Sequence, residues 1–170
     1  MNTRLPAIAL SGAIAAGLLT GTATAANSGV SALDRHYLKS SAEGDAFEIK
    51  GGKMALEKSS DREVRKLART LVKDHTKSLR ETKSIARSLG VKVEAKPSPS
   101  QAWELSIVKS KSGRAFDSWY ASLEVQDHKQ DITEAQEERH NGTNSRVRVS
   151  ARQEIPDLRK HLALARRALR

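Results

Sequence analysis

Four residues on four well-separated stretches of the chain have side chains that bind transition metals. They are one glutamate and three histidines: Glu48, His75, His128 and His161. Imidazole and carboxylate groups suit zinc, copper or iron, and in helical bundles such sites are built from side chains on facing helices. The sequence therefore allows a transition-metal site, provided that the four stretches are helices whose inner faces meet.

Three further polar residues lie at predicted core positions on the same stretches: Asp45, Tyr120 and Glu124. Glu124 precedes His128 by four residues and Asp131 follows it by three, so both acids are within side-chain reach on a helix. Each inward histidine can instead be neutral and hydrogen-bonded to an acid or a backbone carbonyl, as buried polar groups usually are. A hydrogen-bonded core, a metal site and catalysis all remain open at this point.

The known catalytic and dinuclear-metal patterns are missing from the sequence. A di-iron carboxylate bundle needs Glu-x-x-His on two helices, but the residues three before the inward histidines are Val72, Val125 and Leu158. The chain also has no G-x-S-x-G elbow, no H-E-x-x-H motif, no phosphate-binding glycine loop and no cysteine. We therefore expect a binding protein rather than an enzyme.

Four long segments have apolar residues at steps of three and four, the spacing of an amphipathic helix. They cover about 33–58, 60–89, 115–140 and 147–169. Prolines within 91–100 predict a linker, and a short helix is expected over 101–110. Aromatic residues are only 4% of the chain, which is typical of helical bundles. The sequence predicts an all-α four-helix bundle with a short extra helix before the third long one.

Several residues predict where these helices begin, end and approach one another. Ser31 is expected to cap the first helix, and Ser60 and Glu63 match a capping box at the start of the second. Gly90 can take the left-handed conformation that closes a helix. The adjacent glycines at 51 and 52 fall inside the first helix, so we expect a neighbouring helix to approach closely there.

Eight basic residues recur at three- and four-residue steps on the outer face of the second predicted helix. We call them the basic ridge: Arg62, Lys66, Arg69, Lys73, Lys77, Arg80, Lys83 and Arg87. The ridge can be a solvated face partly paired with the acidic third long helix, or it can bind an anionic lipid, polysaccharide or cell-wall polymer. Nucleic acid is an unlikely partner because no aromatic side chains interleave to stack on bases.

The first 25 residues have the order of a secretory signal peptide. Arg4 precedes an apolar run to Leu19, and Ala23-Thr24-Ala25 supplies the small residues of a cleavage site. The run is shorter than the roughly 20 residues of a membrane span. We expect residues 1–25 to be removed, residues 26–170 to form one helical-bundle domain without a membrane span, and the protein to reach the periplasm or cell surface. Removal of Arg4 with this segment leaves 29 basic and 20 acidic residues, and the resulting formal charge of +9 favours anionic partners there.

A set of short motifs in a fixed order resembles a bacterial exported family called domain of unknown function 4142. The motifs are Asp74-His75-Thr76, Phe116-Asp117 with Tyr120 and His128, and Ile155-Pro156-Asp157-Leu158 with His161-Leu162. Ile155 stands where leucine is usual. The resemblance implies a ferritin-like four-helix fold but no known reaction and no established metal. The positions that it implies for testing are Glu48, His75, Tyr120, His128 and His161.

Two functions are consistent with these observations. The first is an exported, non-enzymatic binding protein whose basic ridge engages an anionic envelope component. The alternative is a ferritin-like metal-binding or redox protein that uses Glu48, His75, His128 and His161.

Overall fold

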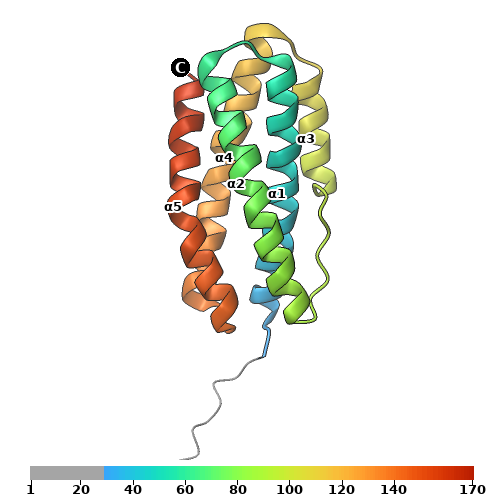
Figure 1. The fold of residues 1–170 in the computed structure, drawn as a ribbon, viewed down its shortest axis with the longest axis vertical. Coiled ribbons are helices and arrows are strands. Elements are labelled where there is room, and N and C mark those ends of the chain that lie inside the picture. The colour runs from blue at the N-terminus through green and yellow to red at the C-terminus, as the bar shows by residue number, and fades with distance from the viewer. Residues whose placement is uncertain (1–28) are drawn as a thin grey trace, which may run out of the picture.

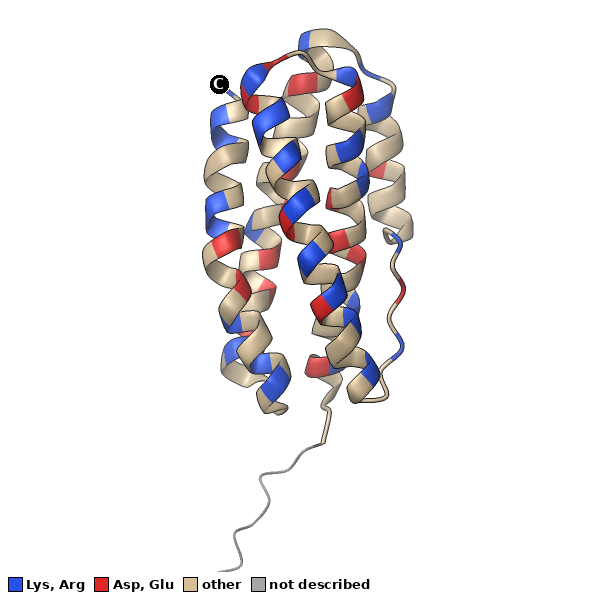
Figure 2. Cartoon of the chain, in the orientation of Figure 1, with Lys and Arg blue, Asp and Glu red and all other residues tan. Residues whose placement is uncertain are grey.

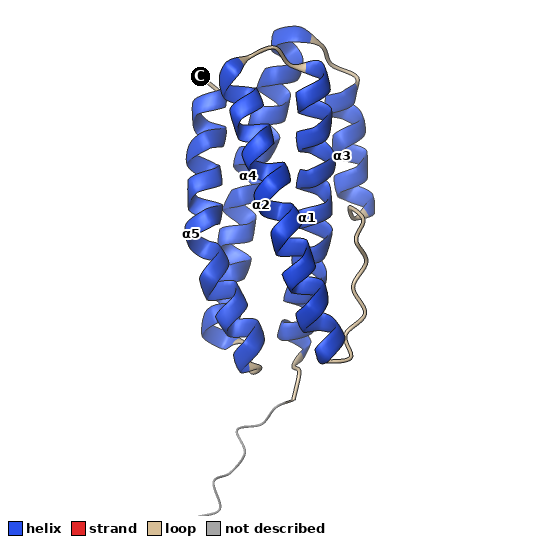
Figure 3. Cartoon of the chain, viewed as in Figure 1, coloured by secondary structure: helices blue, strands red, loops and turns tan. Residues whose placement is uncertain are grey.

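The computed structural model describes residues 29–170, which form five helices and contain no strand (Figure 3). The helices are α1 (Ala32–Lys58), α2 (Arg62–Ser88), α3 (Pro99–Lys109), α4 (Gly113–Asn141) and α5 (Ser145–Ala168). The expected all-α class and the short extra helix are therefore confirmed. The predicted signal segment and its cleavage site after Ala25 lie outside the described residues.

The four long helices form a bundle with one long crossover. In Figure 1, α1 runs upward, α2 and α4 run downward, and α5 runs upward, while the linker and α3 carry the chain back along the outside. The helix α1 packs against α2 and α4, and α5 packs against the same two helices. An up-down-down-up order with one crossover is the ferritin-like arrangement, as expected.

The helix ends agree with the sequence in two places and differ in a third. Ser31 caps α1 in a capping box with Asp34, and Gly90 follows α2 with a φ of 67°. The cap of α2 is Asp61 and not Ser60, because the Asp61 carboxylate accepts from the backbone N–H groups of Glu63 and Val64. Asp and Ser are equally good caps, so the sequence pattern alone could not choose between adjacent residues.

The close helix approach expected at the two glycines of α1 occurs against α2. A Cβ atom added to Gly52 would lie 2.8 Å from Val72 Cγ2 and 3.0 Å from the backbone oxygen of Ala68. A Cβ atom at Gly51 would meet Leu105 of α3 at 3.3 Å. The absence of side chains at these two positions therefore lets α2 and α3 pack onto α1.

The apolar core is divided into two clusters along the bundle axis. One contains Tyr37, Leu38, Ala86, Val91, Ala135, Val147, Ala151, Ile155 and Leu158. The other contains Ala55, Val64, Leu67, Ala68, Leu71, Val108, Phe116, Tyr120 and Ala165. In every long helix, the predicted metal-ligand residue lies in sequence between its members of the two clusters. A polar layer thus crosses the middle of the bundle.

Within residues 29–170, no helix is long and apolar enough to cross a membrane.

Candidate metal centre

The polar layer receives one potential metal ligand from each long helix. Glu48 comes from α1, His75 from α2, His128 from α4 and His161 from α5. Their exposed fractions are 1%, 4%, 0% and 1%, respectively. The structure therefore brings together all four residues of the predicted site, which we call the histidine centre.

The three histidine rings of this centre are in mutual contact. Their ring centroids are 5.8 Å apart for His75 and His128, 5.0 Å for His75 and His161, and 5.3 Å for His128 and His161. Each ring offers one nitrogen within 4.8 Å of the nitrogens offered by the other two. Three imidazoles this close together inside a protein can share a single cation.

One nitrogen of each ring has a hydrogen-bond acceptor outside the centre. His75 Nδ1 lies 2.8 Å from Asp45 Oδ1, and His128 Nδ1 lies 2.8 Å from the backbone oxygen of Glu124. His161 Nε2 lies 3.1 Å from Asp74 Oδ2. When these nitrogens carry the protons, the second nitrogen of each ring has a free lone pair. Such outer partners orient metal-binding histidines in known sites.

The nitrogens left over by this pattern point into the centre. His75 Nε2 and His161 Nδ1 lie 3.2 Å apart, and His128 Nε2 lies 3.0 Å from Glu48 Oε1. The other Glu48 oxygen lies 2.7 Å from His75 Nδ1. Both Glu48 oxygens and His128 Nε2 are buried without a partner in hydrogen-bond geometry. The centre therefore contains acceptor atoms that the protein itself does not satisfy.

The charges in the layer are strongly coupled. Burial alone would lower the pKa of His75, but Glu48 and Asp45 raise it well above its usual value. Burial would raise the pKa of Glu48, but His75 and His128 lower it. Burial lowers the pKa of His128. The carboxylates therefore favour the charged form of His75, whereas burial favours the neutral form of His128.

The three predicted core-polar residues surround the centre as expected. Asp45 accepts from His75, and burial raises its pKa to about 7. Tyr120 and Glu124 are 0% and 1% exposed. Burial, followed by the charge of Glu48, raises the pKa of Glu124 well above its usual value. Together with Glu48, Asp45 and Glu124 bring the buried carboxyl groups beside the three histidines to three.

Four further acids near the centre were not assigned to it from the sequence: Asp74, Asp127, Asp131 and Glu154. Asp74 precedes His75 in the chain and reaches His161 across the boundary between α2 and α5. Glu154 accepts from the Tyr37 hydroxyl, and from Ser78 at 2.8 Å. The spacing of Asp131 from His128 had already placed Asp131 within side-chain reach of that histidine. The positions of Asp74, Asp127 and Glu154 depend on how each helix is rotated about its axis, which sequence spacing does not determine.

An open cavity of about 500 Å³ connects the centre with the surface. Its inner wall includes Glu48, His75 and His161, and its mouth includes Lys77 and Asp157. The cavity is lined mainly by residues of α1, α2 and α5. An ion or a small molecule can therefore reach the histidine centre without unfolding of the bundle.

All eight side chains of the basic ridge are exposed, and Figure 2 shows Lys and Arg positions in blue along α2. Two of them form ion pairs within the helix, Arg62 with Glu63 at 3.2 Å and Lys77 with Glu81 at 3.6 Å. The expected partial pairing with the acidic third long helix is wrong for the described residues. The reason is topological, because α2 packs against α1 and α5 and lies diagonally across the bundle from α4.

A crossover four-helix bundle with a buried histidine and carboxylate layer is the class of protein that the fold and site define. The chain belongs to the family described as domain of unknown function (DUF4142), whose profile matches residues 19–168. It is also similar to a solved structure described as a DUF305 fragment from Deinococcus radiodurans, with a TM-score of 0.72 and 15% identity. That alignment covers 83% of this chain and 97% of the fragment. Comparison with curated proteins found no significant match.

Proposed function

We propose that this protein binds one transition metal ion at the histidine centre. The observation that carries the proposal is the convergence of three buried histidines, each with one nitrogen hydrogen-bonded to an outer acceptor and the other nitrogen free. One nitrogen of each ring lies within 4.8 Å of those of the other two rings. The carboxylate of Glu48, from α1, lies 3.0 Å from His128 Nε2 and can add an oxygen ligand.

The distance between the free nitrogens of His75 and His161 matches the distance between two ligands of one metal ion. Two ligands bound at about 2.0 Å in a tetrahedral zinc site lie roughly 3.3 Å apart. His75 Nε2 and His161 Nδ1 are 3.2 Å apart. If both nitrogens were unprotonated and no cation lay between them, their lone pairs would repel each other. A single proton on His75 can relieve this repulsion, but it leaves His128 Nε2 without a partner.

The ligand chemistry limits the metal to a small group. Imidazole nitrogens with one carboxylate suit zinc, copper or iron and are poor ligands for calcium or magnesium. With no cysteine in the chain, thiolate ligands are excluded. We therefore expect zinc, copper or iron to bind more tightly than calcium or magnesium at this centre.

Metal content after mild purification tests the proposal directly. We expect close to one equivalent of metal in the wild-type protein and a loss of at least tenfold in affinity for added Zn²⁺ in His75→Ala. His36 and His140 are exposed, so His36→Ala and His140→Ala are matched controls that should keep full binding. A wild-type protein that binds no zinc, copper or iron, or a His75→Ala variant that binds as well as the controls, would contradict the proposal.

We place this binding function in an exported, non-enzymatic protein. The support is the signal-type N-terminal sequence and the absence of catalytic motifs from the chain. Expression of the full chain followed by N-terminal sequencing tests the export step. We expect an exported protein whose N-terminal residue is Ala26. An uncleaved protein that stays inside the cell and still contains Arg4 would contradict export.

A second candidate function is the binding of an anionic envelope surface by the basic ridge. It is favoured by the exposure of all eight side chains and by the scarcity of ion pairs among them. We expect salt-sensitive binding to phosphatidylglycerol vesicles that weakens when Lys66, Arg69, Arg80 and Lys83 are changed to Gln. The same number of changes on α5, at Arg152, Arg159, Arg166 and Arg167, is the matched control. Equal weakening in both variants would show that only net charge matters.

A further inference from the structure

Three carboxylates form a second cluster beside the histidine centre. Oxygens of Glu48, Asp127 and Asp131 all lie within 4.8 Å of one another. Glu48 comes from α1, while Asp127 and Asp131 are one turn apart on α4. No histidine takes part in this group. It is therefore chemically different from the histidine centre, although the two share Glu48.

The oxygens of this cluster are satisfied only in part by the protein. Glu48 is 1% exposed and pairs with the histidine centre, because its oxygens lie 3.0 Å from His128 Nε2 and 2.7 Å from His75 Nδ1. The Oδ2 atom of Asp127, in contrast, is buried without a hydrogen-bond partner. A buried carboxylate without donors is costly unless a cation lies beside it. The unpartnered Asp127 oxygen therefore favours a positive charge beside the cluster.

The surrounding interior does not supply that charge. Three more carboxyl groups lie in the same layer: Asp45, Glu124 and Glu154. Among residues 29–170, no lysine or arginine is buried. The three histidines can supply only part of the positive charge that would balance these carboxylates. A single divalent ion at the histidine centre would still leave an excess of carboxylates on the α4 side of the layer.

We propose that Glu48, Asp127 and Asp131 form a second site, the carboxylate site, which takes a hard divalent cation such as Mn²⁺ or Mg²⁺. Oxygen-only ligand sets select such ions, which keep waters in their remaining positions. Asp131 lines the open cavity, so a hydrated ion has a path to the site. The inference rests on the proposed function in one respect, because Glu48 would hold the ions of both sites together.

Electron paramagnetic resonance of Mn²⁺ tests the carboxylate site, because bound Mn²⁺ loses the sharp six-line signal of the free ion. The mature protein is first loaded with one equivalent of Zn²⁺ and then titrated with Mn²⁺. We expect one Mn²⁺ to bind per chain. The double variant Asp127→Asn with Asp131→Asn is expected to lose this binding at least tenfold and to keep its Zn²⁺ stoichiometry. Retained Zn²⁺ shows that the variant is folded.

Asp157→Asn is the matched control, because Asp157 lies at the cavity mouth with a side chain that is 64% exposed. It removes one carboxylate, as Asp131→Asn alone does, without touching the cluster, and it should leave Mn²⁺ binding unchanged. If the double variant does not fold, Asp131→Asn alone is expected to weaken Mn²⁺ binding. Unchanged Mn²⁺ binding in the folded aspartate variant, or no Mn²⁺ binding by the wild-type protein, would overturn the carboxylate site.

The two proposals can fail separately. If His75→Ala binds Zn²⁺ as well as the wild type, the histidine centre is wrong, and the Mn²⁺ titration is then made on the metal-free protein. Loss of Mn²⁺ binding in the aspartate variant would still support the carboxylate site. If Zn²⁺ binds as expected and Mn²⁺ does not, the carboxylate site is wrong and the histidine centre stands.

Discussion

His75 Nε2 lies 3.2 Å from His161 Nδ1, although the two residues are 86 positions apart in the chain. The contact joins α2 to α5, and each ring is held from behind by a carboxylate, Asp45 for His75 and Asp74 for His161. Two rings fixed in this way cannot turn apart easily. The pair is therefore already oriented, as the proposed metal site requires.

Asp74 should control metal affinity without being a ligand. The change Asp74→Ala removes the acceptor of the His161 Nε2–H group, and loss of such an outer partner typically weakens metal binding by about 10- to 100-fold. We expect that decrease in a competition titration with a chromophoric chelator, with the number of bound ions unchanged. Lys160→Ala is the control, because it removes only the second contact of Asp74, at 3.0 Å. Similar losses in both variants would assign the effect to the ion pair.

Bound metal should stabilise the fold by mass action. A ligand at about 100 times its Kd adds roughly 2.7 kcal/mol to the free energy of unfolding. We expect Zn²⁺ to raise the thermal midpoint of the wild-type protein and a chelator to reverse the change. His75→Ala should show no such response, since it removes one of the three rings that contact one another in the centre. A rise of equal size in His75→Ala would locate the zinc elsewhere.

The close contact of α1 with α2 should make Gly52 intolerant of a side chain. In Gly52→Ala the new methyl group meets Val72 Cγ2 at 2.8 Å and the Ala68 backbone oxygen at 3.0 Å. Overpacking of this kind costs about 1–3 kcal/mol, which is more than the roughly 1 kcal/mol gained in helix propensity. We expect a lower free energy of unfolding in urea.

Gly44→Ala on the same helix is the matched control for Gly52→Ala. A Cβ atom added to Gly44 would lie 3.9 Å from Asp131 Oδ1, an ordinary contact distance. This variant should therefore keep most of the helix-propensity gain and be as stable as the wild type or more so. If both variants were destabilised equally, the cost would come from the helix itself and not from the approach of α2.

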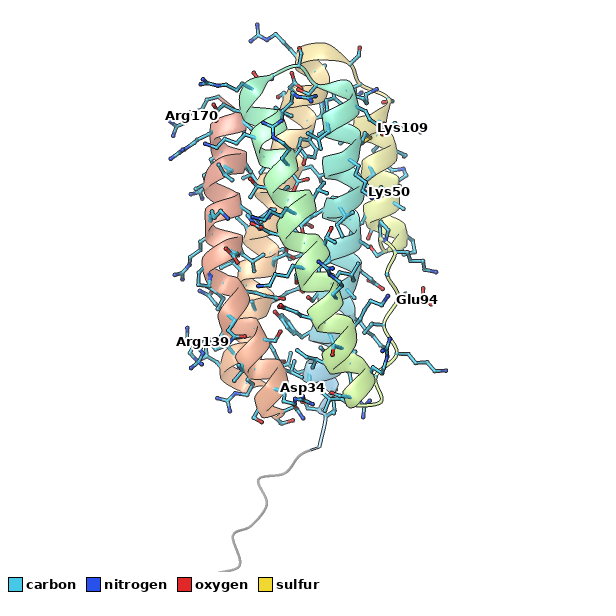
Figure 4. All side chains as sticks on the ribbon, viewed as in Figure 1. Asp34, Lys50, Glu94, Lys109, Arg139 and Arg170 are labelled. Atoms are coloured by element: carbon cyan, nitrogen blue, oxygen red, sulfur yellow. The ribbon has the colours of Figure 1, made fainter. Side chains whose placement is uncertain are left out.

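Two neighbouring carboxyl groups outside the polar layer, Asp34 and Glu138, should make the free energy of unfolding depend on pH. Asp34 lies at the lower end of the bundle (Figure 4) and accepts from Ser31, Thr143 and Asn144. Burial would raise the pKa of Asp34, but these hydrogen bonds lower it. Burial raises the pKa of Glu138 to about 8, and the adjacent Asp34 adds to this rise.

The two pKa shifts change the free energy of unfolding in opposite senses as pH rises. The contribution of Asp34 is present above its unfolded pKa and is lost as the solution becomes strongly acidic. The contribution of Glu138 is complete below its unfolded pKa of about 4.5 and is lost as pH rises toward 8. We expect Glu138→Gln to gain stability relative to the wild type between pH 5 and pH 8 in urea unfolding. The exposed neighbour provides the control, since Glu137→Gln should show a pH profile parallel to that of the wild type.

The sequence predicted most of the helices because their signals are local. The apolar period gave the four long segments, Ser31 and Gly90 marked two ends correctly, and the glycines at 51 and 52 indicated a close approach. Ser60 was the wrong cap because neighbouring Asp61 has an equally suitable side chain. Local chemistry of this kind fixes elements well and boundaries less well.

The ligand residues were predicted because each lies on the inward stripe of its own helix. That reasoning found Glu48, His75, His128 and His161 but could not decide between a hydrogen-bonded core and a metal site. The decision depends on which nitrogen of each ring faces the centre. Sequence spacing does not contain that information, because the outer partners come from other helices or from the backbone.

The sequence by itself determined the helical class and the inward position of the three histidines, because a 3.6-residue period sorts side chains into buried and exposed faces. Only the tertiary structure decided that the basic ridge lies diagonally across from α4, that Asp74 reaches His161, and that Asp127 and Asp131 join Glu48. Those relationships depend on how whole helices are ordered and rotated around the bundle axis. Helix order and rotation are set by packing between distant segments, and no single segment encodes them.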